Sequence, residues 1–225
     1  MNYFGHAAVA ARYSQDPLVA LGAMLPDFVG FLRWPLPPLS DASLSVGVAL
    51  HHATDRVFHR TPTFVSLNRA ASEKLAALSV ARGPARATAH VGVEMLLDAC
   101  LAARRESCTA FRCALDEASG DHVRRALALP AQHHQRLLNV VRAIRERGAE
   151  VWSSEPSIVA QRLARTFATR PRLRLDDSVL PLVECWLESA YLEVQARSID
   201  LEDELHRGLA SEWSDPGKSG AATAG

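Results

Sequence analysis

Helical periodicity runs through nearly the whole chain, and this feature restricts the fold most. Apolar residues recur three and four positions apart, alanine, leucine and arginine dominate, and runs of alternating β-branched residues are missing. Glycine and proline divide the pattern into segments of helical length. The sequence therefore predicts an all-α protein, a single-domain bundle of about eight or nine helices over residues 1–207.

Capping and breaking residues predict several helix boundaries. Asp16 followed by Pro17 predicts a helix start, and Pro26 predicts a break or kink in the apolar run that follows. Ser43 predicts the cap of a helix that reaches about His59.

The end of the chain differs in composition from the rest. The last predicted helix runs from about residue 178 to 207, and the residues from Gly208 onward are mostly small and polar. Such residues bury too little apolar area to offset the entropy lost on ordering. We therefore expect residues 208–225 to form a disordered tail.

Composition argues against several classes of protein. Lysine plus arginine and aspartate plus glutamate both number 25, so no net charge attracts the chain to nucleic acid or to an anionic membrane. No apolar run approaches the roughly 20 residues of a transmembrane helix, and residues 1–11 lack the pattern of a signal peptide. The four cysteines form no C-x-x-C pair, which is typical of small core residues with free thiols. We expect a cytoplasmic protein.

Histidines and a carboxylate share one helix face in the first of two polar stripes. His51, Asp55 and His59 lie four residues apart, so their side chains follow one another along the helix. Imidazole nitrogen with carboxylate oxygen is a donor set that divalent cations bind. A single pair at this spacing is also common as an exposed contact. The remaining histidines are interpreted as surface residues: His122, His133, His134 and His206.

The second stripe is harder to explain without a partner. His90, Glu94 and Asp98 are again four apart, and apolar residues fill the other faces of their helix. Buried carboxylates need a compensating charge, which a metal or arginines would supply. Asp27 lies in an apolar run and poses the same problem, and His6 is a further candidate ligand. The predicted metal-binding set is His6, Asp27, His51, Asp55, His90, Glu94 and Asp98.

Four short motifs carry a resemblance to a known family. They are MNYFGH at 1–6, DFVG at 27–30, the spacing of Gly47, His51, Asp55 and Pro62, and TRPRL at 169–173. Together they resemble the acyl carrier protein phosphodiesterases, all-helical hydrolases that release phosphopantetheine from holo acyl carrier protein. The two stripes also resemble those of the zinc-dependent phospholipase C family. Both resemblances imply a metal-dependent phosphodiesterase.

The chain departs from the first family at two positions. It has Phe58-His59 where that family carries Thr-Asp, and Asp98-Ala99 where the family follows its aspartate with histidine. These departures favour an alternative, a non-catalytic helical binding protein on the same fold.

The leading hypothesis is a phosphoric diester hydrolase with a divalent manganese, magnesium or zinc ion. The metal would lower the pKa of a bound water and hold a phosphoryl oxygen. Asp27 or His59 would take the proton of that water.

Charge is uneven towards the end of the chain. Residues 136–174 contain nine arginines against three glutamates, whereas residues 175–207 contain nine acids against two arginines. One interpretation is that the two segments pack together and neutralise each other in surface ion pairs. The other is that three arginines around a proline turn present a basic rim to an acidic protein such as acyl carrier protein. These are Arg170, Arg172 and Arg174.

Overall fold

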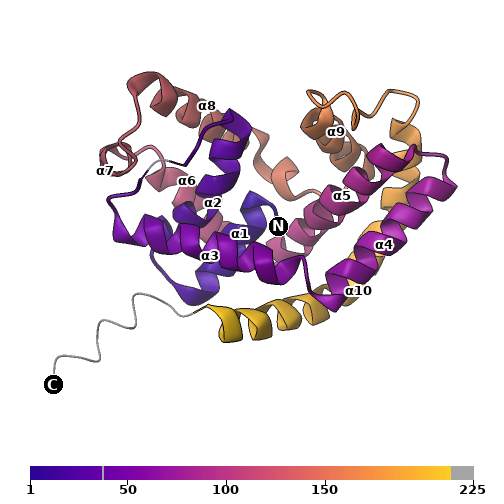
Figure 1. The fold of residues 1–225 in the computed structure, drawn as a ribbon, viewed down its shortest axis with the longest axis horizontal. Coiled ribbons are helices and arrows are strands. Elements are labelled where there is room, and N and C mark those ends of the chain that lie inside the picture. The colour runs from indigo at the N-terminus through magenta and orange to yellow at the C-terminus, as the bar shows by residue number, and fades with distance from the viewer. Residues whose placement is uncertain (37, 214–225) are drawn as a thin grey trace.

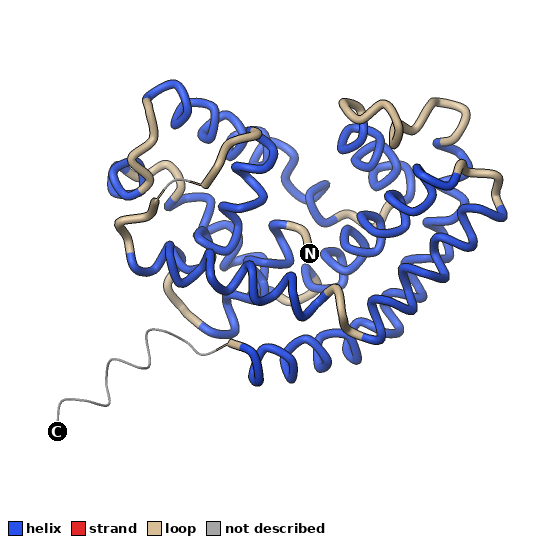
Figure 2. The backbone as a smooth tube through the Cα atoms, in the orientation of Figure 1, coloured by secondary structure: helices blue, strands red, loops and turns tan. Residues whose placement is uncertain are grey.

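Ten α-helices and one short 3-10 helix make up the part of the chain that the computed structural model describes, residues 1–36 and 38–213 (Figure 1). These ranges contain no strand, and only loops join the helices (Figure 2). The all-α prediction is confirmed, with slightly more helices than expected. Across the same ranges, no helix is both long and apolar enough to span a bilayer.

The helices follow one another closely along the chain. In order they are α1 (Tyr3–Tyr13), α2 (Pro17–Leu32), α3 (Ala42–Phe58), α4 (Pro62–Ala77), α5 (Arg82–Ala102), α6 (Arg105–Glu117), α7 (Asp121–Ala126), α8 (Ala131–Arg147), the 3-10 helix η1 (Gly148–Trp152), α9 (Pro156–Phe167) and α10 (Leu180–Glu212).

Two groups of helices meet near the middle of the molecule (Figure 1). Helices α1, α2 and α3 pack together, with α6 and α8 against α2, while α4, α5, α9 and α10 form the second group. Contacts of α1 with α5 and of α3 with α10 join the groups, and one continuous apolar core runs through both. The start of α1, the end of α3 and the middle of α5 therefore lie close to one another.

Two glycines bring α2 and α3 into backbone contact. A Cβ atom at Gly22 would lie 2.3 Å from the carbonyl oxygen of Leu44, and one at Gly47 would lie 2.2 Å from that of Val19. Any side chain at either position would push the helices apart. This close approach places the polar residues of α2 beside those of α3.

Several predicted boundaries need correction. Pro26 lies inside α2 without ending it, and the N-cap of α3 is Asp41, whose side chain accepts from the backbone N–H of the third helical residue, where we had expected Ser43. Helix α10 continues to Glu212 and buries Leu209, so the start of the expected tail is helical. The rest of that expected tail, residues 214–225, lies outside the described residues.

The proposed mutual neutralisation of the two charged segments is wrong for most of their residues. Within the described ranges, one ion pair joins the segments, between Arg174 and Asp176 at 3.5 Å. Acids of α10 pair instead with other elements, as Glu202 does with Arg104 of the α5–α6 junction.

Other side chains also lie elsewhere than predicted. Cys113 and Cys185 are exposed instead of lying in the core. His206, expected on the surface, is half-buried, and its Nδ1 lies 3.0 Å from the hydroxyl of Tyr13.

Candidate metal centre

A buried triad forms where α1, α2 and α3 meet. His6, Asp27 and His51 each offer one ligand atom, and these three atoms lie within 4.8 Å of one another. His6 lies one turn after the Asn2 cap of α1, and the contact between α2 and α3 brings Asp27 beside His51. Three residues far apart in sequence thus converge on one point.

The tautomer of His51 leaves a lone pair facing a carboxylate. Its Nδ1 lies 2.8 Å from the buried carbonyl oxygen of Ala23, so Nδ1 carries the hydrogen and donates it. Burial, together with the neighbouring His6, lowers the pKa of His51 to about 3, so the ring is neutral. Its Nε2 lies 3.4 Å from Oδ2 of Asp55. A lone pair opposite a carboxylate is unfavourable, and a cation between the two would remove the repulsion.

His6 and Asp27 both have buried polar atoms without a hydrogen bond here, although Nε2 of His6 lies 3.2 Å from Oδ1 of Asp55. His6 is fully buried and stacks on His51 with ring centroids 3.8 Å apart. Neither of its ring nitrogens has a hydrogen-bond partner in the described chain, nor does the buried Oδ2 of Asp27. Burial lowers the pKa of His6, and burial with the nearby Asp55 raises that of Asp27 to about 8. Buried polar atoms are normally bonded, so these donors fit a bound cation.

A second triad, less buried than the first, consists of His59, His90 and Glu94. His59 caps the C-terminus of α3, and His90 and Glu94 are one turn apart on α5. Both imidazole Nε2 atoms lie 3.2 Å from Oε1 of Glu94. The histidine side chains are 35% and 40% exposed, so solvent reaches this triad.

Asp55 and Glu94 link the two triads through the amino group of Met1. That group lies 2.9 Å from Oδ1 of Asp55 and 3.1 Å from Oε1 of Glu94. Burial opposes ionisation of both carboxylates, but the amino group and the adjacent histidines outweigh it and lower both pKa values. The centre of the cluster thus holds two ionised carboxylates around a positive charge.

Asp98 joins neither triad. It is fully buried, and its Oδ2 accepts a hydrogen bond of 2.8 Å from Asn2, whose own side chain caps α1. Burial raises the pKa of Asp98 to about 7, although Arg162 opposes the shift. Asp98 therefore fixes the start of the helix that carries His6. The sequence does not single out Asn2 or Arg162 as site residues, because neither lies on a polar stripe.

The three arginines of the predicted basic rim belong to neither triad. Arg170, Arg172 and Arg174 are exposed around a turn that follows α9, in which the N–H of Leu173 donates to the carbonyl oxygen of Arg170 at 2.9 Å. The turn abuts the start of α5, where a Cβ at Gly83 would lie 3.2 Å from the carbonyl oxygen of Arg172.

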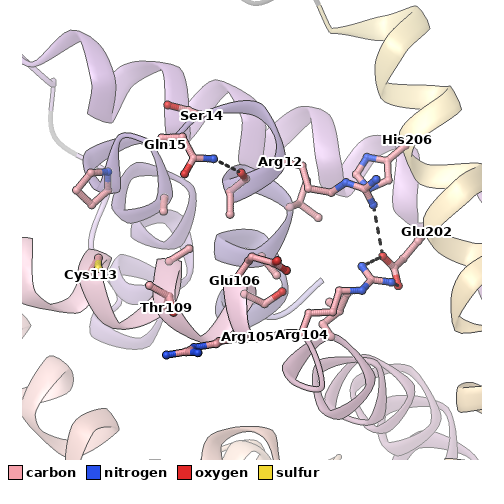
Figure 3. Close-up of a pocket in the computed structure, with 18 of the residues that line it drawn as sticks. Arg12, Ser14, Gln15, Arg104, Arg105, Glu106, Thr109, Cys113, Glu202 and His206 are labelled. Atoms are coloured by element: carbon pink, nitrogen blue, oxygen red, sulfur yellow. Dashed lines mark hydrogen bonds and ion pairs between the residues drawn. The ribbon is translucent and has the colours of Figure 1, made fainter.

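Two cavities lie close to helices that carry triad residues. One of about 670 Å³ lies between α4 and α5 and is lined in part by His90. Another, of about 980 Å³, lies on α1, α6 and α10, where Arg104 and Arg12 both reach Glu202 (Figure 3). No residue of either triad lines the larger cavity, whereas His90 of the exposed triad lines the smaller one.

The donor set suits a divalent cation. Seven residues supply four imidazoles and three carboxylates: His6, Asp27, His51, Asp55, His59, His90 and Glu94. The imidazoles suit zinc, and the carboxylates suit manganese or magnesium. Comparisons of the chain with protein-family models, curated protein sequences and solved structures found no match.

Proposed function

We propose that the protein is a metal-dependent phosphodiester hydrolase with two adjacent cation sites. The supporting observation is the pair of triads linked by Asp55 and Glu94. The buried triad with Asp55 would hold one cation, and the exposed triad would hold the other. Two neighbouring cations activate water and offset the charge of phosphoryl oxygens, the chemistry that phosphoester cleavage requires.

The residues around the cations divide the remaining tasks. Asp55 and Glu94 are held ionised by the amino group of Met1 and the adjacent histidines, and as carboxylates they would supply oxygen ligands to the cations. Burial raises the pKa of Asp27 to about 8, so this carboxyl is mostly protonated near neutral pH, and a bound cation would favour the carboxylate form that could bind the metal or accept a proton. His59 is the more exposed alternative for that step. The exposed triad is the face that meets substrate.

The resemblance to acyl carrier protein phosphodiesterases suggests a protein-borne substrate, with Arg170, Arg172 and Arg174 as the docking rim. The non-catalytic alternative rests in part on the change to histidine at position 59. That histidine lies in the exposed triad, so the change supplies a ligand. We favour the enzyme for this reason. The free cysteines are compatible with the proposed cytoplasmic location.

Metal analysis with an activity assay tests the proposal. Protein stripped with a chelator is reloaded with zinc, manganese or magnesium, and hydrolysis of bis(p-nitrophenyl) phosphate is measured. We expect about two bound equivalents and activity that depends on the added metal. Folded protein that binds no metal and cleaves no diester would favour the non-catalytic alternative.

A further inference from the structure

The cavity between α4 and α5, here called the α4–α5 pocket, extends from the exposed triad to the turn after α9. His90 lines one part of it, and Leu173 of the turn lines another. Its volume of about 670 Å³ is that of a small-molecule site. Because His90 also belongs to the triad, a ligand in the pocket would lie beside the metal centre.

The pocket is positively charged. Arg69 of α4 and Arg86 of α5 line it, and its lining includes no carboxylate. Arg86 has no ion-pair partner among the described residues. Arg69 has one at 3.8 Å, Glu73, and both of those side chains are more than two-thirds exposed, so the pair is weak. Two guanidinium groups are thus available to an anion.

The spacing on α5 relates this charge to the reaction site. Arg86 precedes His90 by one helical turn, so their Cβ atoms lie on one face roughly 5–6 Å apart. A phosphodiester at the exposed triad would leave a second anionic group of the same molecule within reach of Arg86. Asn68 adds a buried Oδ1 that lacks a hydrogen-bond partner in the described chain, an acceptor for a ligand hydroxyl.

We propose that the α4–α5 pocket binds a phosphate group that the substrate carries in addition to its scissile phosphodiester. Guanidinium groups bind phosphate through paired, charge-assisted hydrogen bonds, and Arg86 and Arg69 would provide them. The substrate class is therefore a small phosphodiester with a second phosphate. This inference rests on the proposed function.

A matched pair of chromogenic diesters tests the inference. Thymidine 5′-(p-nitrophenyl phosphate) is compared with its 3′-phosphorylated counterpart, using wild type, Arg86→Gln and Arg82→Gln. Arg82 is an exposed arginine one turn away that does not line the pocket, which makes it the control. We expect wild-type kcat/KM to be about tenfold higher for the 3′-phosphorylated diester. Arg86→Gln should remove most of that advantage, and Arg82→Gln should keep it.

Equal rates on the two diesters in wild type would overturn the pocket assignment and leave the proposed function intact. A loss of the same size in Arg86→Gln and in Arg82→Gln would also overturn the pocket assignment. Calorimetric titration of chelator-treated protein with thymidine 3′,5′-bisphosphate provides a readout without catalysis. We expect about tenfold weaker binding by Arg86→Gln alone. Binding that depends on Arg86, with neither diester cleaved, would support the anion site but refute the proposed hydrolase.

A protein-borne substrate predicts a different result. Cleavage of holo acyl carrier protein that falls in Arg172→Glu but not in Arg86→Gln, with both small diesters cleaved equally, would place recognition on the exposed turn. That outcome would overturn the small-molecule assignment.

Discussion

The two triads contain the same residue types but differ in how exposed their histidines are. In the buried triad, both histidines face one carboxylate, since Nε2 of His6 lies 3.2 Å from Oδ1 of Asp55 and Nε2 of His51 lies 3.4 Å from Oδ2 of Asp55, and both side chains are almost fully buried. In the exposed triad, both histidines lie beside Glu94 and are more than one-third exposed, so water and the carboxylate can satisfy them. Solvent can therefore compensate the histidines of the exposed triad but not those of the buried triad, which is why we expect the buried triad to depend more on a cation.

The largest expected effect comes from removing the carboxylates that link the triads. We expect Asp55→Ala and Glu94→Ala each to lower metal-dependent diester hydrolysis by more than about 100-fold, because even groups outside the ligand shell often cost 10–100-fold. Circular dichroism should stay helical. The control is His52→Ala, an exposed residue beside His51, which should retain activity. If only one of the two variants lost hydrolysis, catalysis would depend on one triad alone. If both variants kept it, the metal assignment would be wrong.

The rise in Tm on metal binding should differ between variants of the two triads, an effect of intermediate size. A cation at 100 times its Kd stabilises the folded state by about 2.7 kcal/mol, which raises the Tm of a chain this size by about 5–10 °C. We expect zinc or manganese to produce this shift in wild type and in His59→Ala, but not in His51→Ala. Calorimetry of chelator-treated and reloaded protein measures it. The same shift in both variants would show that burial does not distinguish the triads.

The smallest effect concerns His206, a half-buried histidine outside both triads. Burial and Arg12 lower its pKa from the ordinary 6.5 to about 4. The unfolded chain therefore takes up a proton at a higher pH than the folded chain, so His206 makes stability fall as pH drops from about 6.5 to about 4. Denaturant unfolding should show a shallower pH dependence in His206→Gln, with unchanged metal content. An unchanged slope would contradict the shifted pKa, and lost metal would link His206 to the centre.

Much of the candidate site could be predicted from the sequence because helical spacing fixes which residues share a face. The stripe that begins at His90 and the apolar surroundings of Asp27 both pointed to buried charge. Three ligand predictions on these elements, His90, Glu94 and Asp27, lie in triads. Asp98 follows the same spacing but bonds to Asn2, because its turn of α5 faces the start of α1. Helical spacing alone does not distinguish a carboxylate that lies beside histidines, such as Glu94, from one that accepts from an amide, such as Asp98.

The helical class, several helix boundaries and the polar stripes follow from the sequence, since these depend on local propensity, capping and periodicity. How the first stripe is divided depends on tertiary packing: His51 packs with His6 and Asp27, whereas His59, at the end of α3, meets α5. Tertiary packing also brings Arg69 of α4 and Arg86 of α5 to the same cavity. These contacts between side chains of different helices depend on how the helix faces pack. Close packing such as that between α2 and α3 joins residues far apart in sequence, so no local pattern predicts it.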